Sequence, residues 1–220
     1  MSFKGMIETC CPKGCEAFTA DVWSFIHGGN SPELRLTVQA QECNLLLCPG
    51  CEMPFFAEAA YIYYEPGADI LAFVFPEAYR AQEAKWRDKM CQDFLAFKDA
   101  FGRKVPLDLE PEVFFGPEGL SELLSDEDYR TDERGVMEFL AKELGLSIYH
   151  VRPGHARKNK IPASLPSAAP AGKGATRGSI IAGLEKLLAA NDRLTAYGDY
   201  LARLKASSDG VPLAGTAAPR

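Results

Sequence analysis

The chain has 220 residues, 47% of them hydrophobic and 25% charged, which is an ordinary composition for a globular protein. No run of 18 apolar residues is present, and the first residues lack the apolar core of a secretory signal, so we expect neither a membrane span nor export. We therefore expect a cytoplasmic protein, whose seven cysteines serve as metal ligands or free thiols in preference to disulfides.

The net charge of −6 is unevenly distributed along the chain. Residues 1–150 carry 13 Lys and Arg against 26 Asp and Glu, whereas residues 151–220 carry 11 against 4. A basic tail can bind nucleic acid, but an acidic body would repel phosphate. We therefore expect the basic segment 152–177 to contact the chain's own body or a protein partner in preference to nucleic acid. The candidate contact residues are Arg152, Arg157, Lys158 and Lys160.

Two short turns place four cysteines at regular spacing. The first reads CPKGC over residues 11–15, and the second reads CPGC over residues 48–51. Proline fixes φ and glycine lets the backbone close tightly, so both sulfurs of a turn point to one side. Four thiolates are the usual ligand set of a closed, tetrahedral zinc site, and buried inert cysteines would rarely produce two Cys-Pro turns. The predicted zinc ligands are Cys11, Cys15, Cys48 and Cys51, with Cys10 as an alternative to Cys11.

The elements between and after these turns alternate strand and helix patterns. Aromatic and β-branched residues predict a strand over 17–25, and Ser31 followed by proline predicts the start of a short helix over 32–42. A strand over 44–47 leads into the second turn. Residues 53–64 and 70–75 flank a Pro-Gly turn and predict an aromatic hairpin.

An apolar stripe at intervals of three and four residues predicts a helix over 77–101, with Cys91 beside the stripe as a small core residue. A strand over 112–115 follows. We then expect one helix from Gly116-Pro117 to about Ser125 and a second from Thr131, as N-cap, to Gly145.

The last 70 residues change in character. Residues 151–178 are rich in Pro, Ala, Gly and basic residues without periodicity, which predicts a disordered linker. Residues 179–206 show a heptad-like apolar seam interrupted by Asn191, which predicts one amphipathic helix, and residues 207–220 form a tail.

The two cysteine turns, the insert of about 30 residues with its short helix, and the Asn44 lead-in resemble a bacterial family known as the CpXC domain. The aromatic hairpin, the charged helix and the FGPEGL segment at 115–120 extend the resemblance over about residues 5–150. The resemblance implies a zinc-ribbon-like fold with four cysteine ligands and no assigned activity. The first turn is one residue longer than the family's Cys-Pro-x-Cys pattern, and we choose Cys11 over Cys10 because Pro12 follows it.

Together these patterns predict an α+β fold. Zinc-ribbon-like hairpins surround the four-cysteine site and pack with helices within a domain of residues 1–150, and a C-terminal helix follows the linker.

Three classes of function remain open from the sequence, and the third is weaker than the first two. The first, which we favour, is a non-catalytic adaptor or accessory subunit that binds a protein partner or a second copy of itself. The second is a metal-thiolate redox or sensor protein holding iron or zinc, because four cysteines can bind either metal. Nucleic-acid binding through 152–177 is a third and weaker hypothesis. No group of residues argues for an enzyme, and His150 and His155 lack a neighbouring carboxylate pair that would complete a second metal site.

Overall fold

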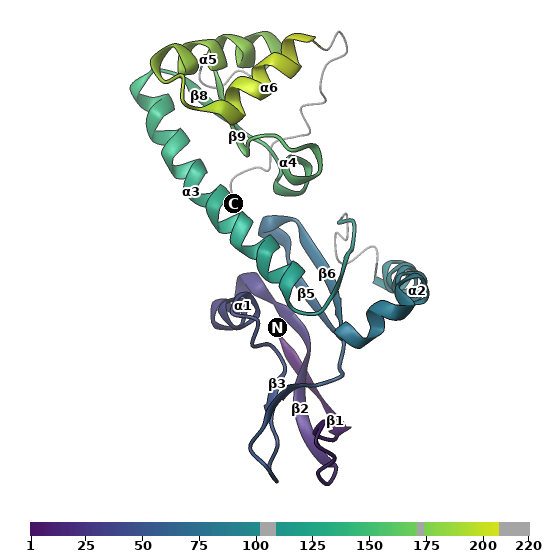
Figure 1. Ribbon diagram of the computed structural model, residues 1–220. Helices are drawn as coiled ribbons and strands as arrows, with labels where there is room; N and C mark the ends of the chain where they lie inside the picture. The colour runs from purple at the N-terminus through teal and green to yellow at the C-terminus, as the bar shows by residue number, and fades with distance from the viewer. Residues whose placement is uncertain (102–108, 171–173, 207–220) are drawn as a thin grey trace. The chain divides into compact units, whose positions relative to one another are not determined.

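The computed structural model describes residues 1–101, 109–170 and 174–206 (Figure 1). The chain is an α+β protein that divides into two compact units, residues 1–125 and 126–220. The described strands are β1 (Phe3–Thr9), β2 (Phe18–His27), β3 (Leu45–Leu47), β4 (Pro54–Phe56), β5 (Tyr61–Glu65), β6 (Ile70–Phe75), β7 (Glu112–Phe115), β8 (Ser147–His150) and β9 (Ser164–Ser167). The described α-helices are α1 (Pro32–Gln39), α2 (Glu83–Phe101), α3 (Glu118–Glu143), α4 (Pro153–Asn159), α5 (Arg177–Ala190) and α6 (Thr195–Ala206).

The first unit is built on a mixed five-stranded sheet in the order β1-β2-β5-β6-β7. The β1–β2 and β5–β6 pairs are antiparallel, while β2–β5 and β6–β7 are parallel. The β5–β6 pair is the predicted aromatic hairpin, closed by a 3-10 turn at Pro66–Ala68. The residues expected to form its first strand, 53–64, divide into two strands, because β4 pairs with β3 in a separate two-stranded sheet.

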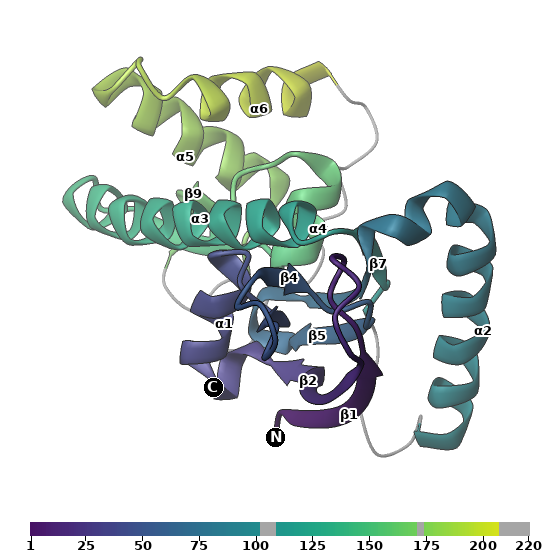
Figure 2. The same ribbon diagram turned by 60° about the horizontal axis from the view of Figure 1, so that its bottom comes forward.

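Helices cover this sheet through two apolar clusters. Tyr63, Ile70 and Ile26 of the sheet pack with α1 and with Leu120 and Leu124 at the start of α3. A smaller cluster joins Met90 and Trp86 of the α2 stripe to Phe75 and Phe115, and Figure 2 shows α2 beside β7. The helix predicted over 77–101 begins as a 3-10 helix over Glu77–Gln82 and continues as α2.

The predicted start of the short helix is confirmed, because α1 begins at Pro32 with Ser31 at the N-cap position, although it ends at Gln39. The Ser31 hydroxyl is hydrogen-bonded to that of Ser2 (3.0 Å) and not to an N–H of the helix. The prediction of two separate helices after β7 is wrong. The helices expected to end near Ser125 and to begin at Thr131 are one continuous helix, α3. The Thr131 hydroxyl donates to the carbonyl of Glu127 one turn earlier, which satisfies it inside the helix instead of at an N-cap. The end of α3 before Gly145, which has φ +62°, agrees with the prediction.

The second unit contains the β8–β9 hairpin, the C-terminal part of α3, and α4 to α6. Its core consists of twelve buried side chains contributed by every one of these elements, among them Met137, Leu165, Leu184 and Leu204. Gly183 lies at the closest approach of α5 to the hairpin, since a Cβ there would meet the Pro166 carbonyl carbon at 2.6 Å.

The prediction of a disordered linker over 151–178 is wrong for most of this segment. Residues 153–159 form α4, and all four residues of β9 are buried. The hydroxyl groups of this strand are satisfied: Ser167 donates to Ser179, 2.9 Å away, and the Ser164 hydroxyl lies 3.3 Å from His150 Nδ1. Small residues without periodicity can therefore pack as a core strand when their polar atoms are bonded.

The prediction of a single C-terminal helix over 179–206 is also wrong. The segment predicted to be one helix instead forms two, α5 and α6. Asn191, in an extended conformation, ends α5. The Asn191 side chain accepts a hydrogen bond from the Arg193 N–H (3.1 Å), so it belongs to a turn and not to a coiled-coil seam. The division between units also falls at 125/126 and not at residue 150. The predicted tail, 207–220, lies outside the described residues.

Candidate metal centre

The first cysteine turn is a tight loop closed by its own backbone. The Gly14 N–H donates to the Cys11 carbonyl (2.9 Å), and Gly14 has φ +78°, a conformation that glycine adopts without strain. The Lys13 N–H donates to the Cys11 sulfur at 3.3 Å. The turn therefore directs a peptide N–H at a sulfur, as backbone around a metal-bound thiolate commonly does.

The second turn lies between β3 and β4. The Glu52 N–H donates to the Cys48 carbonyl (2.8 Å), and the Cys48 N–H donates to the Met53 carbonyl (3.1 Å). Glu52 directly follows the second cysteine of this turn and adopts the left-handed φ of +55°, a conformation that favours glycine. The two turns meet at Gly50, where an added Cβ would lie 3.8 Å from the Cys15 Cβ.

The four cysteines of the two turns converge in space. Their sulfurs all lie within 4.8 Å of one another, and those of Cys15 and Cys51 each lie 3.7 Å from that of Cys11. A tetrahedral metal with metal–sulfur bonds of about 2.3 Å requires sulfurs about 3.8 Å apart. A disulfide would require about 2.05 Å, so these are separate thiols. The donor set therefore fits a four-coordinate metal ion.

Hydrogen bonding gives these thiols unequal acidities. Burial alone would raise the pKa of Cys48, but hydrogen bonds from the N–H groups of Gly50 and Cys51, together with neighbouring thiols, lower that pKa to about 7. The pKa of Cys15 is raised to about 12, mainly by its hydrogen bond with Cys51 and then by that with Cys11. A bound cation would replace the protons that these thiols share in their hydrogen bonds, because a metal ion binds thiolates.

The CpXC family model, described as CpXC protein, matches residues 9–126, which is more than half of the chain. The chain belongs to the CpXC family. The match begins just before the first cysteine turn and contains both turns. No curated protein and no solved structure matches the chain.

The other three cysteines of this CpXC protein lie outside the group. Cys10 is exposed and does not join the four converging sulfurs. Cys43 is buried, and desolvation raises its pKa to about 12. Cys91 was expected to be a small core residue, but it is exposed, because it lies on α2 outside the stripe formed by Trp86 and Met90.

A small apolar cluster supports the metal centre. Phe55 and Leu46, on the inner face of the β3–β4 hairpin, pack against the cysteines together with Phe18 of β2. The rings of Phe18 and Phe55 meet edge to face at 6.2 Å. Asn44 fixes the hairpin to β2, because its side-chain amide accepts from the Trp23 N–H (2.7 Å) and donates to the Trp23 carbonyl (3.0 Å). No pattern in the sequence predicts this double hydrogen bond, although Asn44 belongs to the lead-in that carries the family resemblance.

The basic residues singled out in the sequence are largely built into the second unit. Arg157 forms an ion pair with Glu127 at 2.9 Å, and both side chains are nearly buried. Arg152 precedes α4 and is half-buried, whereas Lys158 and Lys160 are exposed. The sequence predicts four basic contact residues on a disordered segment. The structure instead has two exposed basic side chains, Lys158 and Lys160, on a folded surface.

A Ser164–His150–Glu138 series has the residue types of a hydrolytic triad. The Ser164 hydroxyl lies 3.3 Å from His150 Nδ1, and His150 Nε2 lies 3.7 Å from a Glu138 oxygen. Ser164, however, is fully buried within β9. A substrate cannot reach its hydroxyl, so we assign this series a structural role.

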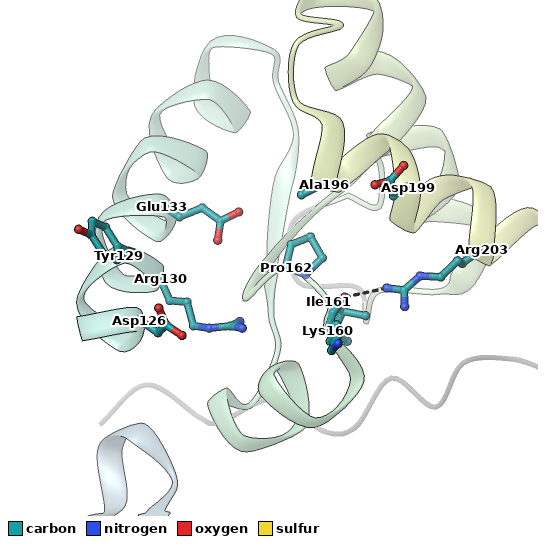
Figure 3. Close-up of a pocket in the computed structure, with 10 residues that line it drawn as sticks. All are labelled: Asp126, Tyr129, Arg130, Glu133, Lys160, Ile161, Pro162, Ala196, Asp199 and Arg203. Atoms are coloured by element: carbon teal, nitrogen blue, oxygen red, sulfur yellow. Dashed lines mark hydrogen bonds between the residues drawn. The ribbon is translucent and has the colours of Figure 1, made fainter. Parts of the chain in front are cut away.

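A hollow of about 780 Å³ in the second unit faces the solvent between α3 and α6 (Figure 3). Its charged lining is mixed in sign and consists of Asp126, Glu133, Asp199, Arg130, Lys160 and Arg203. The Arg203 guanidinium donates hydrogen bonds to the backbone carbonyls of Asn159 (3.3 Å) and Lys160 (2.9 Å). This mixture favours no class of ligand.

Among the helices that the structure describes, none has the length and apolar character needed to cross a membrane.

Proposed function

We propose that this CpXC protein is a zinc-stabilised, non-catalytic adaptor or accessory subunit that acts by binding another protein. The observation that carries the metal assignment is the convergence of four thiols with sulfur–sulfur distances of 3.7 Å from Cys11. Zinc held by four cysteines is a closed site, in which no coordination position is left for a substrate. The ion would then act by supplying folding energy.

The proposal places the protein in a reducing cytoplasm. None of the seven cysteines is in a disulfide, and free thiols persist in that compartment. The role of an adaptor draws support from the exposed apolar residues of the first unit, which have no use in holding the metal.

The test of the metal assignment is elemental analysis of protein purified without chelator. We expect one zinc per chain in the wild-type protein and in Cys10→Ser, and loss of zinc in Cys11→Ser. Protein that contains neither zinc nor iron would overturn the proposal, and the reverse result for the two variants would move the ligand from Cys11 to Cys10.

A metal-thiolate redox or sensor protein is the second candidate. It is favoured by the peptide N–H groups directed at Cys11 and Cys48, because hydrogen bonds to sulfur tune the reduction potential of an iron centre. Zinc bound by thiolates does not absorb visible light. A visible absorption band in the purified protein would therefore indicate iron and favour this second candidate over the first.

Binding of nucleic acid through the basic segment stays a weaker prediction. The ion pair of Arg157 with Glu127 leaves that side chain poorly placed to contact phosphate. Affinity for DNA or RNA that fell steeply with salt and was lost in a Lys158→Ala, Lys160→Ala double variant would support it.

A further inference from the structure

The outer face of the β3–β4 hairpin is apolar. In the register of the two strands, Leu45 lies opposite Phe56 and Leu47 lies opposite Pro54. All four side chains are exposed, with 67% of Leu47 and 48% of Phe56 accessible to solvent. We define these four residues as the outer face, since the alternate residues of both strands point inward to the cysteines.

The metal centre does not require this face to be apolar. In an antiparallel pair with one face packed and the other in water, the outer positions normally carry polar residues. Here both strands are apolar throughout, and contiguous apolar surface of this kind marks sites of interaction. The outer face therefore has a use other than folding.

A cavity of about 230 Å³ opens beside Phe56. Most of its lining is apolar and includes Val74 and Phe75, and buried Tyr61 and the acidic residues Glu58 and Glu77 complete it. The Tyr61 hydroxyl neighbours the Cys43 thiol and makes no well-formed hydrogen bond to any residue that the structure describes. The cavity is smaller than the roughly 300–1,000 Å³ typical of small-molecule sites. Its size and lining suit one apolar side chain of a bound segment.

The surroundings of the outer face are acidic. Residues 36–79 contain six Asp and Glu and no Lys or Arg. Glu42 precedes β3, Glu52 lies in the turn that joins the strands, and Glu58 follows β4, and all three are exposed. A contact with a second copy about a twofold axis would bring these carboxylates against one another, whereas a basic partner would complement them.

We propose that the outer face and the cavity beside Phe56 bind a segment of another protein that carries an apolar anchor side chain flanked by Lys or Arg. This inference rests on the proposed adaptor function and adds the chemistry of the partner. The apolar side chain fills the cavity, the flanking cations face Glu42, Glu52 and Glu58, and the bound metal holds the hairpin that presents them.

The experiment selects peptides from a displayed random library on the full-length, metal-loaded protein, with the Phe56→Ser variant as counter-selection. We expect the enriched peptides to carry Leu, Phe or a similar side chain next to Lys or Arg. One synthetic peptide from the selection should bind at least tenfold more weakly to Phe56→Ser and Leu47→Ser. Its affinity for the control Leu95→Ser, a change at an exposed leucine of α2, should be unchanged.

The charge term is tested with the same peptide. Glu52→Gln and Glu58→Gln should each weaken binding of the peptide. Added salt should reduce the affinity of the wild type more than it reduces that of the variant that carries both changes, because salt screens the charges that the variant lacks. Enrichment of acidic or uncharged peptides, or no enrichment over Phe56→Ser, would overturn the proposal.

Two further measurements separate the alternatives. A dimer in analytical ultracentrifugation that Phe56→Ser converts to a monomer would identify a second copy as the occupant and overturn the basic partner. The metal content of every variant is measured in parallel. A protein that holds zinc but binds peptides away from the outer face refutes this inference alone, whereas a protein without metal refutes the proposed function.

Discussion

The four-cysteine region of the first unit and the core of the second unit differ in how much apolar packing stabilises them. Around the metal centre, the apolar cluster has three buried residues, Cys11, Cys48 and Phe55, and two of them are ligand candidates. The core of the second unit has twelve buried residues and contains none of the cysteines. A cluster of three buried residues is too small to offset the conformational entropy of two turns and a hairpin, so we expect metal coordination to supply the difference. We expect the second unit, with its larger apolar core, to fold without metal.

Removal of a ligand gives the largest expected effect and tests this contrast directly. In Cys48→Ser, we expect loss of the metal and of hydrogen-exchange protection in residues 10–16 and 45–56. Structural zinc contributes on the order of 10 kcal/mol in small domains, so the loss should be complete at 25 °C. Protection in α5 should not change. Equal loss of protection in α5 would show that the two units do not fold independently, and Cys91→Ser serves as the control at an exposed thiol.

The buried ion pair of the second unit gives the next largest effect. Arg157→Met leaves Glu127 buried without its main cation, which should lower the free energy of unfolding of this unit by about 3 kcal/mol. Lys158→Met, at an exposed neighbour, should change it by less than about 0.5 kcal/mol. Chemical denaturation followed by the fluorescence of the tyrosines checks both. Equal effects would mean that α4 is not docked on α3.

Two glycines of the second unit should respond in opposite directions to the same change. Gly183→Ala places a methyl group 2.8 Å from the Ser167 nitrogen, and overpacking against backbone should cost about 2 kcal/mol. Gly198 of α6 has no atom within 4 Å of an added Cβ, so Gly198→Ala should stabilise the unit by about 0.5–1 kcal/mol. Thermal melts of the two variants check the signs, and neither variant should alter the metal content.

The smallest effect concerns pH. Burial, aided by the charge of Arg134 and opposed by that of Glu138, lowers the pKa of His150 below its ordinary value of 6.5. The unfolded chain then takes up the proton more readily than the folded unit. Stability is therefore independent of this group above about pH 6.5 and falls as the pH drops below that value. The decline between pH 7 and pH 5 should be slightly shallower in His150→Gln, and a steeper decline would contradict the direction of the shift.

The metal centre was the part most readily predicted from the sequence. Paired Cys-Pro turns specify their own local geometry, so the spacing of the four cysteines was sufficient to predict that their sulfurs would converge. The order of the strands was not accessible, because β2 pairs with β5 across an intervening hairpin and helix. Such pairings depend on contacts that neither strand encodes alone.

The second unit was the part most poorly predicted, for two physical reasons. The buried strand β9 is made of Ser, Leu and Pro, and its burial depends on Gly183 of α5 admitting its backbone closely, which composition does not report. The apolar spacing continued through Asn191 because α5 and α6 pack on the same core. Periodicity records which side of a segment is buried, and it does not record whether the backbone turns in between.

Helix α3 has a consequence for how the second unit of this chain begins to fold. Residues 118–125 of this helix belong to the first unit, and its remainder belongs to the second. The family match stops at residue 126, inside the helix and far from its last residue, Glu143. Starting a helix is unfavourable, whereas adding residues to an existing one gains a hydrogen bond for each. The part of α3 after residue 126 therefore extends a helix that the first unit has already started, so this part of the second unit forms without a nucleation step of its own.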